Sequence, residues 1–523
     1  MIHRHENKEN GLTGERISWE LQRAFYSFRR SQVLTVIPIQ IAALLFLYAK
    51  GAGEIYLDLL PLLILISLLS TYLVCLLHGN QRILLLSLFL LTVGTMLQSL
   101  FKEEQLLKDP QAYSSQSLTQ SLQIQYLLAI AAAILVGFLY WNLREISDIK
   151  TAELLTLLSL GLSLATLLLS KGVGGVKNWV SIGGFSVQTT EIIKFLYLFI
   201  AAALLGTVDK PDRQRLVGFY LVSFMDMGFL ILEGEFGTLL LLLMVFFTFL
   251  FLFVPEIKVF LLTVISMGAL AAVTVFTGMQ LDKYIELGYQ IGSNPVVKKF
   301  LSNYHKIANR VIYWMHPEKD ADGLGYQLLK ARESIVLGGW FGTSSVTDLP
   351  VKTSDLVFPA LIQRCGMIFA LLVFLIFILL WLEGMKVCVR KQDKYQRMMA
   401  VGLISMFLDQ TIIIIAGSTG LCPLTGITLP FISSGGSSLV VSFMLMGVLL
   451  CISGKIPWKG RNSEEVTFFA KGTDCAKRIL ASGHHHVRVF IQNLCTGAGH
   501  IGRGRSAKSG SEAGGIREGI RQR

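Results

Sequence analysis

About a dozen predominantly apolar runs, each close to 20 residues long, recur between residues 33 and 453. A bilayer core is crossed by roughly 20 residues of α-helix, and within it the backbone must satisfy its own hydrogen bonds. Only 16% of the residues are charged, against about 25% in soluble domains. The sequence therefore predicts an all-α integral membrane protein, a polytopic helical bundle of about 10–12 transmembrane helices. A large soluble core is excluded.

The expected spans follow from the positions of these runs. They lie near residues 33–50, 55–77, 82–101, 125–142, 152–170, 190–207, 216–232, 236–255, 258–278, 356–382, 398–418 and 431–453. The breaks near Glu233 and at Pro255 are short, and the sequence leaves open whether each one ends a helix or only kinks it.

Lysine and arginine concentrate in alternate short loops between the predicted spans. These residues are Arg82, Arg144, Lys150, Lys210, Arg213, Arg215, Lys386, Arg390, Lys391, Lys394 and Arg397. Such loops favour the cytoplasmic side. With an even number of spans, both termini of this multi-pass plasma-membrane protein are expected in the cytoplasm. The same bias accounts for the net charge of +12, so no nucleic acid ligand is expected.

The two ends of the chain are polar. Residues 1–32 are predicted to form a cytoplasmic arm, either a helix on the anionic leaflet or a solvated lead-in. Residues 456–523 are rich in Gly, Ser, Lys and Arg, which indicates a basic, disordered cytoplasmic tail. The run His484-His485-His486 in this tail is weak evidence for a metal site, and the 7 cysteines show no disulfide or metal spacing.

One gap between predicted spans is far longer than the others. It covers residues 280–355, outside the membrane in this topology, and mixes charged, aromatic and glycine residues. A structureless loop of that length is unusual in a compact protein, so a functional role is expected. The gap ends at Asp355, where the apolar sequence resumes.

Two further clusters place charges at the outer ends of spans. Glu191 and Lys194 are three residues apart and share a helix face. They either face a polar cavity or form an ion pair that only anchors the helix, since charges at membrane depth are costly. Glu233 and Glu235 flank a break between spans. This pair indicates a polar cavity or, alternatively, a simple interfacial turn.

A third cluster, residues 420–438, contains two prolines, several glycines and many hydroxyls. Such a run suits a re-entrant loop that lines a cavity, where backbone N–H groups and hydroxyls can hold a phosphate oxygen.

In this order, these runs resemble the motifs of the SEDS family (shape, elongation, division and sporulation), the FtsW/RodA/SpoVE group. Residues 316–327, 338–342 and 349–355 resemble further motifs of the family, and the resemblance covers about residues 82–453. A SEDS-type core is then expected over residues 81–455, including the extracytoplasmic loop 280–355. Two additional transmembrane helices within residues 33–80 precede it.

The sequence departs from the family pattern at several positions. Ser434 stands where the family usually has Tyr, Thr189-Thr190 replace Pro-Ser, Glu233-Gly234 replace Gln-Pro, Glu235 replaces Asp, and Gln363-Arg364 replace Glu-Glu. These changes concern the level of activity of the protein and not its membership of the family.

The resemblance implies a peptidoglycan glycosyltransferase that polymerises lipid II, with inversion, during cell elongation, division or sporulation. Asp355 matches the essential Asp of the family and is implied as the base for the acceptor hydroxyl. Its alternative role is a cap on the next helix. Candidate substrate-binding residues are Lys177, Trp179, Gln188, Glu191, Lys194, Glu235, Lys330, Arg332, Ser433, Gly435, Gly436 and Ser437.

The diphosphate leaving group needs positive charge, so a divalent cation, Mg or Mn, is a candidate cofactor. The family also implies a class B penicillin-binding protein, a transpeptidase, as partner. Two other functions stay open. A lipid II flippase requires a polar path through the spans, and an inactive scaffold would only recruit a cell-wall synthase.

Overall fold

The computed structural model describes residue 22 and residues 24–454, except 110–113, 143–148, 171–178, 183–184, 207–212, 255, 288–294, 321 and 344–347. Most of the predicted arm, the whole predicted tail and Lys177 lie outside these residues. The described part holds twelve helices long and apolar enough to cross a membrane. A multi-pass, all-α membrane protein, as predicted, is thus confirmed.

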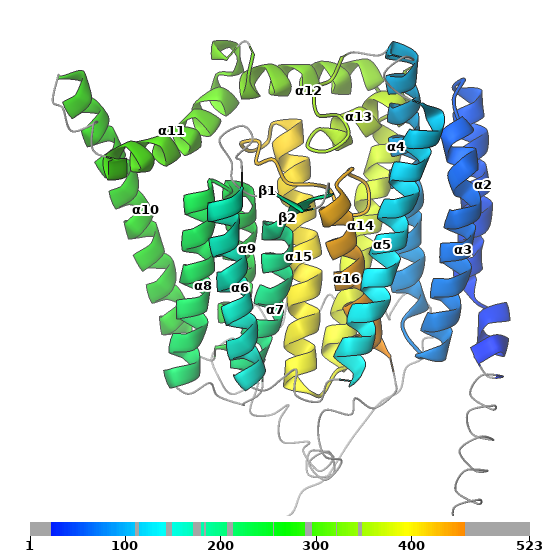
Figure 1. Cartoon of the computed structure of the whole chain (residues 1–523), viewed down its shortest axis with the longest axis horizontal. Helices are drawn as coiled ribbons and strands as arrows, with labels where there is room; N and C mark the ends of the chain where they lie inside the picture. Colours follow the sequence, from blue (N-terminus) through cyan, green and yellow to red (C-terminus); the bar gives the residue numbers. More distant parts are fainter. Residues whose placement is uncertain are drawn as a thin grey trace, which may run out of the picture. The chain divides into compact units, whose positions relative to one another are not determined.

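The first candidate span, Ala24–Ala49, includes the 3-10 turn η1 (Gln32–Thr35) and helix α2 (Val36–Ala49). The following spans are α3 (Glu54–Leu76), α4 (Gln81–Lys108), α5 (Ser115–Asn142), α6 (Ile149–Leu169), α7 (Thr189–Gly206), α8 (Arg213–Glu233), α9 (Phe236–Phe253), α10 (Ile257–Glu286), α14 (Met367–Arg390), α15 (Lys394–Thr419) and α16 (Gly436–Ser453). Figure 1 shows them side by side as one bundle.

Helices α4, α7 and α15 form the centre of this bundle. In the most apolar 18 residues of α4, α7 and α15, 83%, 94% and 78% of the residues are buried. The corresponding stretch of α10 is only 6% buried. Caps supplied by the sequence mark the start of α4 and the end of α15. The Asn80 side chain accepts from the N–H of Arg82 at 2.9 Å to start α4, and Gly420 ends α15 in the left-handed conformation.

Two predicted spans differ from the structure in a way that matters for the site. The run 356–382 is not one helix, because it divides into α13 (Val357–Cys365) and α14 at Gly366. Gly366 has φ +89°, and a side chain there would collide with the Trp340 carbonyl. The run 431–453 becomes helical only at Gly436, so residues 431–435 belong to the loop before α16.

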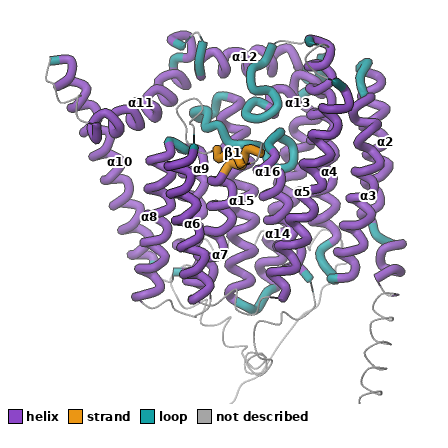
Figure 2. Tube along the Cα trace, in the orientation of Figure 1, coloured by secondary structure: helices purple, strands orange, loops and turns teal. Residues whose placement is uncertain are grey.

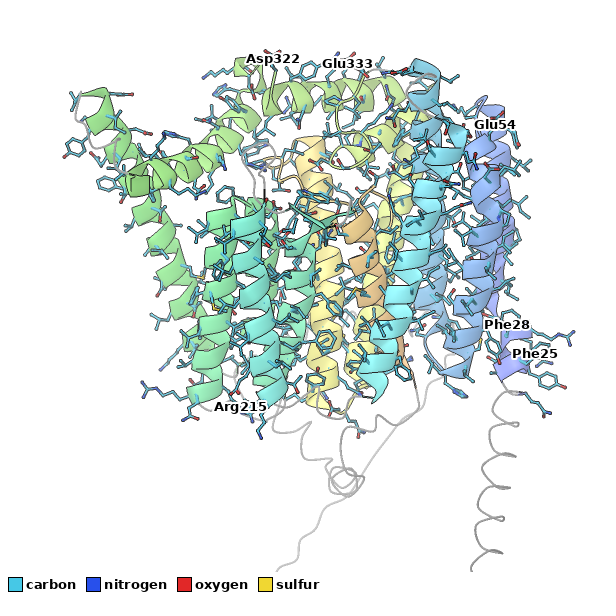
Figure 3. All side chains as sticks on the ribbon, viewed as in Figure 1. Phe25, Phe28, Glu54, Arg215, Asp322 and Glu333 are labelled. Atoms are coloured by element: carbon cyan, nitrogen blue, oxygen red, sulfur yellow. The ribbon has the colours of Figure 1, made fainter. Side chains whose placement is uncertain are left out.

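The long polar gap is largely ordered, which confirms that it is not a structureless loop. Helix α10 extends to Glu286, and α11 (Pro295–Met315), the turn η4 (Pro317–Lys319) and α12 (Leu324–Gly338) follow. In Figure 1 and Figure 2 these elements lie across one end of the bundle. Figure 3 shows Asp322 and Glu333 at this end, and Phe25, Phe28 and Arg215 at the opposite end. The two sets occupy opposite faces, as the predicted topology requires.

Three hydrogen bonds attach α11 to the bundle. Asn303 Nδ2 donates to the Ile231 carbonyl at 2.9 Å, Trp314 Nε1 to the Gly420 carbonyl at 2.9 Å, and Arg310 Nη1 to the Leu424 carbonyl at 2.6 Å. The donors are spaced seven and four residues apart, so they share one face of the helix. That face of α11 therefore covers the ends of α8 and α15.

Candidate functional site

Asp355 lies on a tight turn directly before α13. The N–H groups of Ser354 and Leu356 both donate to the Val351 carbonyl, at 3.1 and 3.2 Å. Val351 has φ +44°, which is an outlier for a β-branched residue. Such conformations persist only where the surroundings over-determine them, and they cluster at functional sites.

The surroundings of this turn come from the loop before α16 and from α4. The Ser434 N–H donates to the Thr353 carbonyl at 2.7 Å, and the Ser433 hydroxyl donates to the Ser354 carbonyl at 2.7 Å. Gln98 Nε2, from inside α4, donates to the Thr353 carbonyl at 3.0 Å. These bonds join segments that are distant in sequence, and they fix the backbone that carries Asp355.

The carboxylate of Asp355 faces the loop 420–435. A Cβ on Gly426, which has φ +76°, would lie 3.6 Å from Asp355 Oδ2. Phe431, at the far end of this loop, also has a positive φ of 64°. The left-handed backbone at this position favours glycine, and the loop passes at ordinary van der Waals distance from the carboxylate.

Arg310, which is not among the residues predicted from the sequence, also belongs to this site. Its guanidinium reaches the Leu424 carbonyl and lies within electrostatic range of both Asp355 and Glu235. Burial raises the pKa of Asp355 above its ordinary value, while the Ser354 hydroxyl and the Arg310 guanidinium lower it. Arg310 therefore favours the ionised form of Asp355.

The predicted pair Glu191 and Lys194 forms a buried ion pair. Lys194 Nζ lies 2.9 Å from Glu191 Oε1, and the side chains are 1% and 4% exposed. Glu235, 7% exposed, accepts from the Thr238 hydroxyl at 3.2 Å. Glu235 is also within electrostatic range of Glu191, Lys194 and Arg310. These charges therefore form one cluster with Asp355.

The other predicted residues lie around this cluster at different distances from it. Strands β1 (Trp179–Ile182) and β2 (Phe185–Gln188) form an antiparallel hairpin, in which Trp179 pairs with Gln188. The Gln188 N–H donates to the Ser437 hydroxyl at 3.2 Å. The hairpin therefore meets the start of α16, where Gly435 is the cap residue and Gly436 the first helical residue. Figure 2 shows it among the loops at the end of the bundle where α11 and α12 lie.

Lys330 and Arg332, both on α12, differ in what they contact. Lys330 Nζ pairs with Glu333 at 2.8 Å and lies over the Tyr326 ring, so these contacts do not join it to Asp355. The Arg332 guanidinium lies against Gly420, at the start of the loop that faces Asp355. Of these two cations, Arg332 is therefore the one that contacts the loop beside Asp355.

Comparison with known proteins gives a consistent picture. The model of the FtsW/RodA/SpoVE family, described as cell cycle proteins, matches residues 80–456. The stage V sporulation protein E of Bacillus subtilis is 30% identical over 338 residues, which cover 62% of this chain and 83% of that protein. The peptidoglycan glycosyltransferase RodA of Mycobacterium bovis is 27% identical, over 58% of this chain and 64% of RodA.

A solved structure supports the fold. It is described as "Structural coordination of polymerization and crosslinking by a peptidoglycan synthase complex" and matches with a TM-score of 0.55 and 20% identity. The match covers 72% of this chain and 97% of the solved one. The family model leaves α2, α3 and the preceding residues unmatched, but it includes every element of the site described above. The chain therefore belongs to the FtsW/RodA/SpoVE family of cell cycle proteins, the SEDS family.

Proposed function

We propose that this protein is a peptidoglycan glycosyltransferase that polymerises lipid II at the outer face of the cytoplasmic membrane. The observation that carries the proposal is the setting of Asp355. Its carboxylate stands on a turn fixed from several sides, within electrostatic range of the Arg310 guanidinium, at the end of the bundle where α11 and α12 lie. Relatives named as peptidoglycan glycosyltransferases support the reaction class.

In the proposed reaction, the acceptor's GlcNAc 4-hydroxyl attacks the anomeric carbon of the donor. The new C–O bond forms as the bond to the lipid diphosphate breaks with inversion, and the diphosphate leaves with the electron pair. Asp355 takes the hydroxyl proton, a role that typically contributes about 10²–10⁴-fold. Arg310 favours the carboxylate form that this role requires, whereas burial opposes it.

The developing charge on the diphosphate requires cationic groups and oriented donors. Arg310, Arg332 and Lys194 are the candidates for the cationic groups. Ser433, in the loop before α16, and Ser437, in the first turn of α16, are the candidate donors. Lys177 stays a prediction. Gln188 and Trp179 would line the side of the site nearest α16.

A divalent cation, Mg²⁺ or Mn²⁺, stays a proposal. Among the described residues, no group of three or more His, Cys, Asp or Glu side chains could hold a metal. Mg²⁺ commonly binds one or two carboxylates together with substrate phosphates, and Asp355 and Glu235 are the carboxylates that would serve. The ion would neutralise charge on the diphosphate.

We further propose a cytoplasmic location for both termini and a class B penicillin-binding protein as partner. The described chain begins and ends on the same side of the bundle, since the Asn80 N–H bonds Ser453 Oγ at 2.8 Å and Phe25 and Phe28 lie at that end. The solved synthase complex, whose title pairs polymerization with crosslinking, supports a crosslinking partner.

One observation keeps the flippase alternative in view. Asp226 on α8 and Asp409 on α15 are 0% and 8% exposed. They lie seven and ten residues from the outer ends of their helices, about 10 and 15 Å deep at 1.5 Å per residue. Carboxylates therefore lie at depth within the spans as well as at the end of the bundle where α11 and α12 lie. A flippase should lose lipid II transport in Asp226→Asn, whereas a polymerase should keep glycan synthesis.

The direct test uses the full-length protein purified with and without a class B penicillin-binding protein. Lipid II is added, and glycan strands are resolved by electrophoresis. We expect strands from the wild type and none from Asp355→Asn. No strands from the wild type in either preparation would overturn the proposal in favour of a scaffold.

A further inference from the structure

The outer end of α4 carries two adjacent carboxylates that contact different parts of the molecule. Glu104 Oε2 accepts from Lys352 Nζ at 2.5 Å, and its Oε1 accepts from Arg364. All three side chains are largely shielded, with 16%, 20% and 11% exposure for Glu104, Lys352 and Arg364. Lys352 lies three residues before Asp355 on the same turn, and Arg364 lies in the last turn of α13.

Glu104 therefore joins both flanks of Asp355 to the bundle. The Lys352 ammonium also lies 5.3 Å from the centre of the Phe101 ring, one turn earlier on α4. Without Glu104, two cations would face each other in a poorly solvated site, an arrangement that is strongly unfavourable. Arg364 is also where this sequence has a basic residue in place of the glutamate usual in the family. In this chain, Arg364 forms an ion pair with Glu104.

Glu103 holds a different element. Its Oε2 and Oε1 accept from the N–H groups of Gly53 and Ile55, at 2.7 and 2.8 Å. These donors are the N-cap residue and the second residue of α3, a helix start whose free N–H groups and dipole favour a carboxylate. Helix α3 packs beside α4 in the bundle (Figure 1). The additional hairpin α2–α3 is thus tied to the same end of α4 that holds the Asp355 turn.

We propose that Glu104 is a positioning residue for Asp355, and that Glu103 ties the α2–α3 hairpin to the same end of α4. In this arrangement helices α2 and α3 stabilise the end of α4 that binds the Asp355 turn. The inference rests on the proposed glycosyltransferase function and adds a source of geometric control to it.

The test is steady-state kinetics of the full-length protein with lipid II. Misplacing a catalytic group by about 1 Å can cost about 10²-fold in rate. We expect Glu104→Gln to lower kcat by about 10- to 100-fold with little change in KM. Glu104→Asp, which keeps the charge, should recover part of this loss. Loss of substrate binding alone would raise KM instead, and that result would overturn the proposal.

A matched control lies one turn further along α4. Lys108 Nζ pairs with Asp348 at 2.7 Å and so joins the same helix to the same segment, but the side chains are 61% and 84% exposed. Exposed pairs contribute little. Lys108→Met and Asp348→Asn should therefore keep wild-type kcat, and an equal loss in these variants would overturn a specific role for Glu104.

Lys352→Met separates positioning from folding, because it leaves the Glu104–Arg364 pair in place. It should lower kcat, and the double variant with Glu104→Gln should be no worse than the poorer single variant, as expected for residues that act together. Unchanged kcat in Lys352→Met, in a preparation where Asp355→Asn is inactive, would refute the inference and leave the proposed function intact. Inactivity of the wild type would instead count against the proposed function.

Glu103→Gln tests the link to the hairpin. It should lower kcat by a smaller factor, about 3-fold, because α3 keeps its other contacts with α4. Glu54→Gln, in the same turn of α3, is the control, since the Glu54 side chain makes none of these bonds. A Glu103→Gln protein with the same kcat as Glu54→Gln would remove the hairpin from the proposal.

Discussion

The two charged groups closest to the proposed chemistry are held by different kinds of structure. Asp355 stands on a turn that the bundle grips through α4 and the loop before α16. Arg310 reaches the same place from α11, which follows α10, the span with only 6% of its window buried. The turn of Asp355 is thus held by two separate parts of the bundle, whereas Arg310 depends on a single helix whose hydrogen bonds reach only the ends of α8 and α15 and the loop at Leu424. The difference indicates that geometric precision is concentrated on Asp355.

The largest effect is expected for Asp355 itself. Asp355→Asn is nearly isosteric but has no basic site, so polymerisation should fall by about 10²-fold or more. Asp355→Glu should also be strongly impaired, because it moves the carboxylate by one methylene. Glycan synthesis from lipid II is the measurement, with insertion and transpeptidase binding as controls. Near-normal synthesis by Asp355→Asn would remove it as the base.

Lys194→Met should reduce turnover by about 10²-fold and also destabilise the protein. Removing one partner of a buried ion pair typically costs about 3–5 kcal/mol, because the other charge stays buried. The double variant Glu191→Gln/Lys194→Met should regain thermal stability but not activity. If the double variant recovers both, the pair only anchors α7.

Arg310→Gln should lower kcat and change the pH profile. The base must be ionised, so activity falls as the pH drops through the pKa of Asp355. Because Arg310 lowers that pKa, its removal should move the acidic limb to higher pH. Arg310→Lys keeps the charge and should leave the limb nearly in place. A limb unmoved in Arg310→Gln would mean that Arg310 does not act on Asp355.

The hydrogen bonds that hold the Asp355 turn can be tested at two neighbouring residues, Ser433 and Ser434. The Ser433 hydroxyl donates to the Ser354 carbonyl and accepts from the Leu429 N–H, so Ser433→Ala should lower kcat about 10-fold. Ser434 acts through its backbone N–H, which Ser434→Ala retains, so this control should be close to wild type. Equal losses in the two variants would show that side-chain contacts do not hold the turn.

The smallest loss of activity is expected for a change in α11, the helix that carries Arg310. Trp314→Phe removes the bond to the Gly420 carbonyl but keeps most of the aromatic ring, so a loss of about 3-fold is expected. Trp340→Phe is the control, because the Trp340 side chain is 64% exposed. A Trp314→Phe loss as large as that of Ser433→Ala would contradict the contrast between the two regions.

The spans could be predicted because hydropathy and helix length decide them together. The division at Gly366 could not, because it depends on a close approach of the Trp340 carbonyl that local sequence does not reveal. The same holds for Phe431, whose apolar character suits a span although its backbone lies in a loop. Contacts between distant segments overrode the local pattern at both positions.

The site was predicted in part. The i, i+3 spacing was enough for the Glu191–Lys194 pair, and the family motif was enough for Asp355. Arg310 was one of many basic residues in a polar segment, and its importance depends on the way α11 folds back over the bundle. Gln98 left a weak signal, a lone amide in an apolar run, but its partner Thr353 lies 255 residues away.

Helix α10 has a further consequence through its length. Its 30 residues span about 45 Å at 1.5 Å per residue, whereas the hydrocarbon core is about 30 Å thick. The last two turns contain Gln280, Asp282 and Lys283, so this excess emerges on the side of α11. Helix α10 therefore sets the height of α11 above the acyl chains. The length of α10 thus carries α11 beyond the acyl chains, on the side of the bundle where Asp355 lies.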